Sequence, residues 1–301
     1  MKKDSNDGIQ SEWSEYELRE GLKSRLLEEE ALKRGFEVER LTFDKMIVSI
    51  NGKHLLFKDM NGPMSSTAIN EIVDNKYLAR TLIKKTGIST PSSTYLLIHQ
   101  KEEILDFVHS IGYPVVLKPN NLARGQGVFT HIDSDESLII HLDKISEVIG
   151  STDERILIEK QFIGEDFRFF VVNNEVLAVT QRARANVTGD GKQTIFELIR
   201  EKNEKRLQDR DLKHYLIPTD PNKLGRLYRE GKTIDSIPEK GEKVIIRDES
   251  NIASGGEGID FTEKVQPEFK KIAVKAVNSI PGFRYAGVDV IAEDITKEPN
   301  K

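Results

Sequence analysis

The sequence predicts an α+β fold with a small additional region at its N-terminus, and three stretches of the 301-residue chain lead to this prediction. Residues 1–68 combine one amphipathic helix with a short sheet. Residues 69–155 alternate between helix and strand patterns, and residues 156–301 begin with three strands in close succession. We therefore expect a helix-plus-sheet region followed by two α+β subdomains, with boundaries near residues 68 and 155.

The N-terminal region contains an expected helix and an expected hairpin. Apolar residues recur at helical spacing over residues 15–33, and Gly35 follows as a C-cap. Alternating runs over residues 36–41 and 46–50 predict two strands. Asn51-Gly52 then predicts a two-residue hairpin turn that leads into a third strand.

The same patterns assign the elements of the two larger regions. Residues 69–85 are expected as one helix ended by Gly87, and Asn173-Asn174 as a turn between strands. The other expected helices are residues 102–111, 136–148, 194–212 and 268–278, and the other expected strands are residues 95–98, 115–117, 156–159, 167–172, 176–182, 243–247 and 285–291.

Composition excludes several classes of function. The net charge of −5 gives no global field for nucleic acid or an anionic membrane, and the charge-dense residues 200–213 are balanced enough to be a solvated helix face. The absence of cysteine excludes a thiolate nucleophile, a disulfide scaffold and cysteine-ligated metal. No apolar run reaches membrane-spanning length, and the first residues lack the apolar core of a signal peptide. A cytoplasmic location is expected.

The most informative segment is the apolar strand of residues 113–119, which carries Lys118 near its end. A loop with Arg124, Gly125, Gln126 and Gly127 follows directly. A cation at a strand end, beside a backbone that can approach an anion closely, suits a polyphosphate. The alternative is a hairpin with a solvated lysine. Residues 189–194 (GDGKQT) do not form a second phosphate loop, because they fail the Walker spacing.

A second candidate segment begins with Glu159, Lys160 and Phe162 at the end of a buried strand. Glu165 and Asp166 follow a few residues later. Backbone groups at such a strand-to-loop break can read a purine edge, and a carboxylate can accept hydrogen bonds from ribose hydroxyls. The alternative is an exposed acidic turn.

The C-terminal half supplies further polar candidates. Asp289 lies in an otherwise apolar strand, where a buried acid needs a partner or a cation such as Mg²⁺, although strand alternation could instead turn it to solvent. Asn251 opens a loop with Ser254 and two glycines, shortly after Arg247. Arg247 and Arg182 can bind acyl or phosphoryl oxygens bidentately, although surface arginines are common.

The order of these segments resembles the ATP-grasp superfamily of carboxylate–amine ligases, over residues 65–293. The likeness is greatest to the ATP-grasp part of cyanophycin synthetases and of bifunctional glutathione synthetases. Its most specific pieces are the segments at residues 185–191 (ANVTGDG), 251–256 (NIASGG) and 287–289 (GVD).

The resemblance implies an ATP-grasp fold, in which two α+β subdomains clasp ATP, with ATP and Mg²⁺ as cofactors. It implies a role for each of the following residues: Lys76 and Lys118 on the phosphates; Arg124, Gly125, Gln126 and Gly127 in the covering loop; Glu159, Lys160 and Phe162 around adenine; Asp166 or its neighbour Glu165 on ribose; Asp289 on magnesium; and Arg247, Asn251 and Arg182 on the transferred phosphoryl and acyl groups.

The chain departs from the family pattern in two places. Ala253-Ser254 stands where relatives usually carry Ser-Thr, so one hydroxyl is lost. The Glu-x-Asn strand that the family places after Asp289 does not occur before the sequence ends. The C-terminal subdomain is therefore expected either to be a fragment or to have an incomplete magnesium site.

The expected activity is ATP-dependent ligation of a small carboxylate to an amine through an acyl phosphate. Amino acids or short peptides are the expected substrates, with no nucleic-acid or membrane partner, and a homo-oligomer is left open. A catalytically impaired ATP-binding module and an ATP-grasp phosphotransferase are the alternatives.

Overall fold

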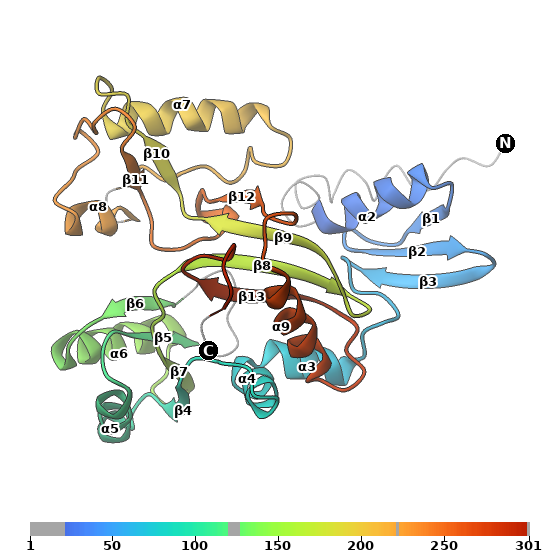
Figure 1. The fold of residues 1–301 in the computed structure, drawn as a ribbon, viewed down its shortest axis with the longest axis horizontal. Helices are drawn as coiled ribbons and strands as arrows, with labels where there is room; N and C mark the ends of the chain where they lie inside the picture. The colour runs from blue at the N-terminus through green and yellow to red at the C-terminus, as the bar shows by residue number, and fades with distance from the viewer. Residues whose placement is uncertain (1–21, 120–126, 221–222, 300–301) are drawn as a thin grey trace. The chain divides into compact units, whose positions relative to one another are not determined.

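The computed structural model describes residues 22–119, 127–220 and 223–299 (Figure 1). Contacts between Cα atoms divide the chain into two compact units, Met1–Thr67 and Ala68–Lys301. Each unit is described below by itself. Among the described residues, no helix is long and apolar enough to cross a membrane.

The first unit packs one helix on a three-stranded antiparallel sheet. Helix α2 (Leu22–Lys33) is followed by strands β1 (Glu37–Arg40), β2 (Lys45–Ile50) and β3 (Lys53–Lys58), in the order β1-β2-β3. Asn51 and Gly52 have φ values of 51° and 75°, which confirms the predicted hairpin turn. Residues 15–21 of the expected helix lie outside the described residues.

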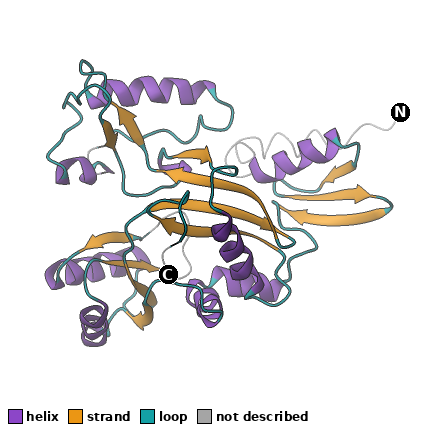
Figure 2. Cartoon of the chain, in the orientation of Figure 1, coloured by secondary structure: helices purple, strands orange, loops and turns teal. Residues whose placement is uncertain are grey.

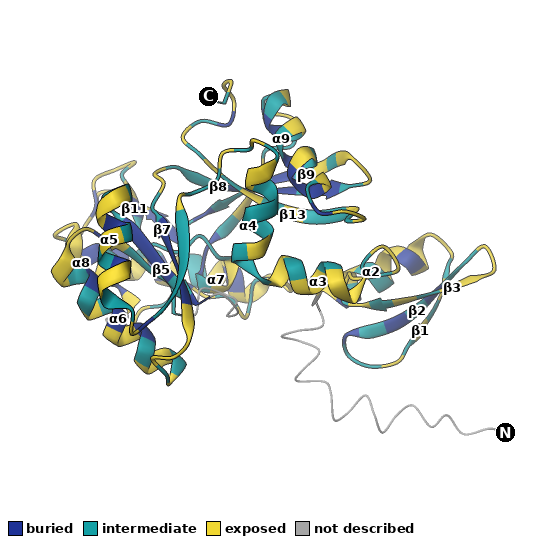
Figure 3. Ribbon diagram, turned by 90° about the horizontal axis from the view of Figure 1, so that it is seen from below, coloured by how far each residue is buried: buried dark blue, intermediate teal, exposed yellow. Residues whose placement is uncertain are grey.

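The second unit begins with two helices and a four-stranded antiparallel sheet. Helices α3 (Thr67–Asp74) and α4 (Lys76–Lys85) precede strands β4 (Ser93–Leu97), β5 (Val115–Pro119), β6 (Phe129–Ile132) and β7 (Arg155–Lys160). The strand order is β4-β7-β5-β6. Helices α5 (Lys101–Ile111) and α6 (Asp135–Ile149) pack on this sheet, and Figure 3 colours much of β5 and β7 as buried.

Side-chain alternation in this sheet decides which residues are available for a site. Val115 and Leu117 of β5 and Ile156 and Ile158 of β7 belong to the core beneath the helices. Because successive side chains point to opposite faces, Lys118 and Glu159 lie together on the other face.

A second sheet has the order β12-β9-β8-β13 (Figure 2). Its strands are β8 (Glu165–Val172), β9 (Glu175–Ala183), β12 (Glu257–Asp260) and β13 (Tyr285–Ala292). Helix α9 (Pro267–Asn278) packs on one face, with Phe167, Phe169 and Val179 of the sheet in the shared core. The opposite face carries the charged side chains of Asp166, Arg168, Arg182 and Asp289 and is called the polar face below.

A third, smaller group completes the second unit. Strands β10 (Asn186–Thr188) and β11 (Lys243–Ile245) pair with each other. Helices α7 (Ile195–Gln208) and α8 (Gly225–Arg229) contribute buried residues to the same core. A 3₁₀ turn, η2 (Ile252–Ser254), leads to β12. The sequence patterns did not predict β10, α8, η2 or β12.

Among the expected boundaries that differ in the structure, the helix expected over residues 194–212 ends at Gln208. The single helix expected over residues 69–85 is two helices, because the side chain of Asn75 accepts a hydrogen bond from the Leu78 N–H and caps α4. The domain boundary expected at residue 155 falls at the start of β7, and that strand pairs with β4 and β5 of the preceding segment. Strand β7 therefore belongs to the first sheet of the second unit.

Candidate functional site

One buried carboxylate, that of Glu159, binds two cations on the face of the β4-β7-β5-β6 sheet that lies opposite helices α5 and α6. Glu159 is only 7% exposed. The Lys118 Nζ donates to its Oε1 at 2.5 Å, and the Arg80 Nη1 of α4 binds its Oε2. Lys118, which is predicted to bind phosphate, is thus in direct contact with Glu159, which is predicted to line the adenine pocket.

The electrostatic surroundings of Lys118 include two more groups from distant segments. Burial, followed by the nearby cations Arg80 and Lys76, lowers the pKa of Lys118, and the carboxylate of Asp289 acts in the opposite direction. Burial and then Arg80 also lower the pKa of Lys76. The structure therefore brings both Lys76 and Asp289 within electrostatic reach of Lys118, and the concentration of positive charge favours an anion.

Arg80 is a site residue that the sequence interpretation missed. It follows Lys76 by four residues in α4, so both side chains lie on one face of the helix. Burial lowers the pKa of Arg80 to about 10. The only signal in the sequence was the i, i+4 spacing from Lys76. This spacing is common in charged helices and indicates a site residue only once the structure shows Arg80 in contact with Glu159 of β7.

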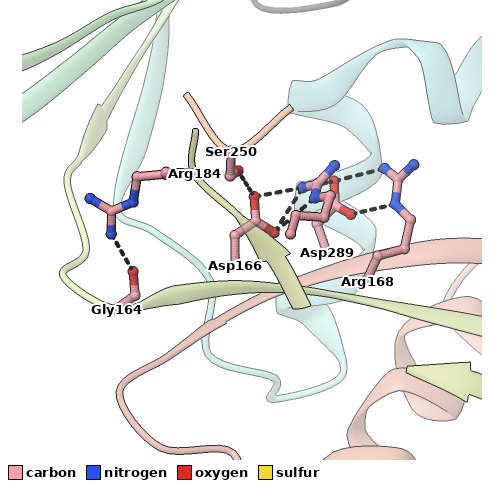
Figure 4. A network of polar contacts seen from close by, with 7 residues as sticks. Gly164, Asp166, Arg168, Arg184, Ser250 and Asp289 are labelled. Atoms are coloured by element: carbon pink, nitrogen blue, oxygen red, sulfur yellow. Dashed lines mark hydrogen bonds and ion pairs between the residues drawn. The ribbon is translucent and has the colours of Figure 1, made fainter. Parts of the chain in front are cut away.

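The polar face of the second sheet carries a network of two carboxylates and two arginines (Figure 4). Arg168 donates to Asp289 at 2.8 and 3.0 Å. Arg182 bridges the two carboxylates, 2.8 Å from Asp166 and 3.1 Å from Asp289. Ser250 also donates to Asp166, at 2.6 Å, which ties the segment after β11 to this face. Three of the predicted site residues therefore meet here.

The position of Asp289 corrects the interpretation that it is buried in an apolar strand. Val288 and Val290 pack against the core beneath α9, so alternation turns Asp289 to the polar face, where its side chain is 46% exposed. The solvent-facing alternative describes the geometry correctly. Even so, Asp289 is not a bare surface acid, because two arginines bind it.

A magnesium site formed by protein side chains alone does not fit the described residues. They contain no group of three or more His, Cys, Asp or Glu side chains that could hold a metal ion. Magnesium is usually bound through one or two carboxylates together with substrate phosphates, and Asp289 fits that more limited role.

The predicted adenine and ribose residues lie at the end of β7 and the start of β8. The Lys160 Nζ donates to the carbonyl oxygens of Gly112 and Tyr113, at 3.1 and 2.5 Å, so its side chain is anchored to backbone. Phe162 is 47% exposed, and Glu165 accepts a hydrogen bond from Gln181. The side chain of Phe162 is accessible to a ligand, whereas that of Lys160 is already bound.

The loop predicted to cover the phosphates is described only at its last residue. Gly127 has φ 65°, and a Cβ there would lie 2.9 Å from the Pro119 side chain, so this position needs glycine. Arg124, Gly125 and Gln126 lie outside the described residues.

The predicted catalytic residues Arg247 and Asn251 flank Ser250 but make separate contacts. Arg247 binds Glu249 through two hydrogen bonds of 2.9 and 2.8 Å. The Asn251 carbonyl accepts hydrogen bonds from the Ser254 and Gly256 N–H groups and so fixes the turn that follows. The bond between Ser250 and Asp166 holds this segment at the polar face of the second sheet.

Comparison with known proteins gives a consistent result. The family model for the phosphoribosylglycinamide synthetase ATP-grasp (A) domain matches residues 74–211. The glutathione biosynthesis bifunctional protein GshAB of Clostridium perfringens is 31% identical over 92% of this chain and 36% of its own length. The cyanophycin synthetase of Geminocystis herdmanii is 35% identical over 75% of this chain and 26% of its own length.

A solved structure extends the likeness to three dimensions. The crystal structure of a bifunctional glutathione synthetase from Pasteurella multocida has a TM-score of 0.62 and 26% identity, over 90% of this chain and 36% of that one. This chain thus spans about a third of the length of the bifunctional relatives. The predicted α+β class and ATP-grasp fold are confirmed. The chain belongs to the ATP-grasp superfamily.

Proposed function

We propose that this chain forms the ATP-dependent part of a ligase that joins a small carboxylate to an amine. The observation that carries the proposal is the pairing of Arg80 and Lys118 with Glu159, together with the position of Lys76 and Asp289 within electrostatic reach of Lys118. The relatives support the chemistry, since their names denote synthetases of glutathione and cyanophycin.

In the proposed reaction a carboxylate oxygen of the substrate attacks the γ-phosphorus of ATP. The bond from that phosphorus to the β,γ-bridging oxygen breaks, ADP leaves, and an acyl phosphate forms. The amine nitrogen then attacks the acyl carbon, phosphate leaves with the C–O bond electrons, and the nitrogen loses a proton. Alignment and charge neutralisation supply most of the catalysis, so no enzyme nucleophile is needed.

The site residues divide into proposed roles by position. Lys76 and Lys118 hold the phosphates, and Arg80 keeps Glu159 in place beside them. Phe162 and the backbone of residues 159–162 line adenine, while Asp166 or Glu165 binds ribose. Arg182, Arg247 and Asn251 are proposed to contact the phosphoryl and acyl oxygens.

Magnesium is part of the proposal because its expected carboxylate is present. The ion would neutralise phosphate charge when bound together with the nucleotide, and Asp289 would supply one ligand. Arg168 and Arg182 bind both oxygens of that carboxylate in the structure. The Oδ1 atom takes one of these contacts and Oδ2 takes two, so a lone pair of Oδ1 would remain to bind the ion.

A non-ligating ATP-binding module is the second candidate, and one observation favours it. The described residues lack a set of three metal-binding side chains, and a site with one carboxylate holds its ion weakly. Such a module would bind ATP without turning it over.

The test measures ATP binding by calorimetry and ADP release with Mg²⁺ across a panel of amino acids and dipeptides, on a chain verified to be full length. Mass spectrometry of the products separates an amide from a phosphoester, which a phosphotransferase would leave. Amide formation that requires both a carboxylate and an amine is the expected result. Tight ATP binding with no ADP release across the panel would overturn the ligase proposal in favour of the module.

We also propose that the enzyme acts in the cytoplasm, where ATP and free amino acids are available.

A further inference from the structure

Helix α7 carries a buried arginine that takes no part in the contacts described above. Arg206 is only 4% exposed. Its guanidinium donates to three backbone carbonyls, those of Tyr215 at 2.7 Å, Gly255 at 2.8 Å and Gly256 at 2.7 Å. Tyr215 lies in the segment that directly follows α7, whereas Gly255 and Gly256 lie 49 and 50 residues after Arg206, so one side chain joins three parts of the second unit.

A charge in this position needs an explanation, because burial disfavours it. Among the residues that the structure describes, no carboxylate lies within ion-pair distance of Arg206, and burial lowers its pKa despite the opposing fields of Glu257 and Asp209. An apolar side chain would remove the charge but would take the guanidinium donors from two buried carbonyls and one partly buried carbonyl, which costs more than a well-bonded guanidinium. Arginine suits the position because its planar fork supplies several donors at once.

The carbonyls that Arg206 binds fix the loop on which Asn251 lies. The N–H of Gly256 donates to the Asn251 carbonyl at 3.1 Å, so holding Gly256 also holds Asn251. The loop has little room to move on its other side, since a Cβ on Gly255 would lie 2.7 Å from the Ile217 Cα. Asn203, one helical turn before Arg206, binds both the N–H and the carbonyl of Ile217.

We infer that Arg206 is a positioning residue for the transfer step, acting through the Gly255-Gly256 backbone to present Asn251 to the acyl phosphate. This inference rests on the proposed ligase function. Arg206 itself touches no group proposed to bind ATP, so its effect should fall on turnover and spare nucleotide affinity.

The experiment compares Arg206→Met, Arg206→Lys and the control Ile199→Ala. Methionine keeps the approximate length and removes every donor, whereas lysine retains some of them. Ile199 is fully buried on the same helix and contacts no loop carbonyl through its side chain, so Ile199→Ala reports a general loss of stability. The readouts are kcat, the KM for ATP, and hydrogen exchange of the amides of residues 251–256.

The expected result for Arg206→Met is a fall in kcat of at least tenfold, with the KM for ATP within twofold of wild type. Exchange of the loop amides should accelerate at least tenfold. Arg206→Lys should recover part of both effects, and Ile199→Ala should show neither at temperatures where it is folded. An Arg206→Met chain with unchanged loop exchange, or with faster exchange and an unchanged kcat, would overturn the inference.

The two proposals fail in different ways. A wild-type chain that binds ATP but forms no ADP would refute the ligase proposal and, with it, a role for Arg206 in transfer. The exchange measurement would still show whether Arg206 holds the loop. An active wild-type chain with an equally active Arg206→Met variant would refute only the role of Arg206.

Discussion

Replacing Glu159 by glutamine tests the charge cluster on which the proposed nucleotide site depends. Glutamine keeps the shape of the side chain and removes its charge, which leaves Lys118 and Arg80 without their shared carboxylate. Arg80, whose pKa is about 10, would then keep its charge at neutral pH in a largely buried setting without a carboxylate partner. We expect the Glu159→Gln chain to fold but to be clearly less stable than wild type at neutral pH.

The size of the effect follows from burial. Removing one partner of a fully buried ion pair costs about 3–5 kcal/mol. The side chains of Lys118 and Arg80 are 15% and 24% exposed, so solvent screens part of the unpaired charge. We therefore expect a loss of about 2–4 kcal/mol in unfolding free energy, or roughly 5–15 °C in Tm for a domain of this size.

The loss should shrink as the pH rises. Burial and neighbouring cations already lower the pKa of Lys118, and removing the carboxylate lowers it further. Above its folded pKa, Lys118 in the variant is neutral, while the unfolded chain still binds the proton up to the ordinary lysine pKa of about 10.4. In wild type Lys118 titrates at a pKa of about 6, and the unfolded chains bind the same proton. The difference in stability between the two chains should therefore narrow as the pH rises toward 6 and stay constant from there to pH 9.

The assay is urea unfolding followed by circular dichroism from pH 5 to pH 9. The matched control is Glu268→Gln, which removes the same charge from an exposed i, i+3 pair with Lys271 and should change stability by less than about 0.5 kcal/mol. A Glu159→Gln chain within 0.5 kcal/mol of wild type at pH 7 would refute the reasoning, since it would show that Glu159 does not hold the two cations in solution.

Three further substitutions test other parts of the site. Lys118→Ala should weaken ATP binding by about 10- to 150-fold, the equivalent of one charge-assisted hydrogen bond of about 1.5–3 kcal/mol, and should abolish turnover; unchanged affinity in calorimetry would remove Lys118 from the site. Asp289→Asn should raise the magnesium concentration for half-maximal ADP release at least about tenfold, as measured by a metal titration. It should change the free energy of unfolding by less than about 1 kcal/mol, as measured by thermal unfolding. Gly255→Ala should lower the free energy of unfolding by more than about 1 kcal/mol, because φ is 88° and the new Cβ would lie 2.7 Å from the Ile217 Cα. A variant with the same Tm as wild type would contradict this.

The periodic elements of the fold were predictable because their patterns are local. The strand that carries Lys118 and the hairpin at Asn51-Gly52 follow from apolar sequence patterns and turn chemistry. The break at Asn75 was missed, since apolar residues continue at helical spacing on both sides and only the capping bond to Leu78 separates the two helices. Strand β10, only three residues long, has too little pattern to be seen without its partner β11.

The sequence was enough to predict several residues of the candidate site, but not which residues they contact. The motifs indicated Lys118, Glu159 and Asp289, but strand alternation alone could not decide whether Asp289 faces the core. The supporting residues Arg80 and Ser250 were missed for a shared reason. Each is a common surface residue type, and each becomes part of the site only because a strand distant in sequence places a carboxylate beside it.

The ion pairs of the site bear directly on how a nucleotide would bind. Lys118 binds Glu159, Arg182 binds Asp166, and Arg247 binds Glu249, so these three cations already have carboxylate partners. A triphosphate at this site would exchange one set of charge-assisted bonds for another, because the lysine and arginines are already partly desolvated. The net gain in free energy from each exchange is therefore smaller than that of a new ion pair, and affinity should depend on how many partners are replaced together. Single charge substitutions at this site should consequently be non-additive, and a double-mutant cycle on Lys118 and Glu159 would measure that coupling directly.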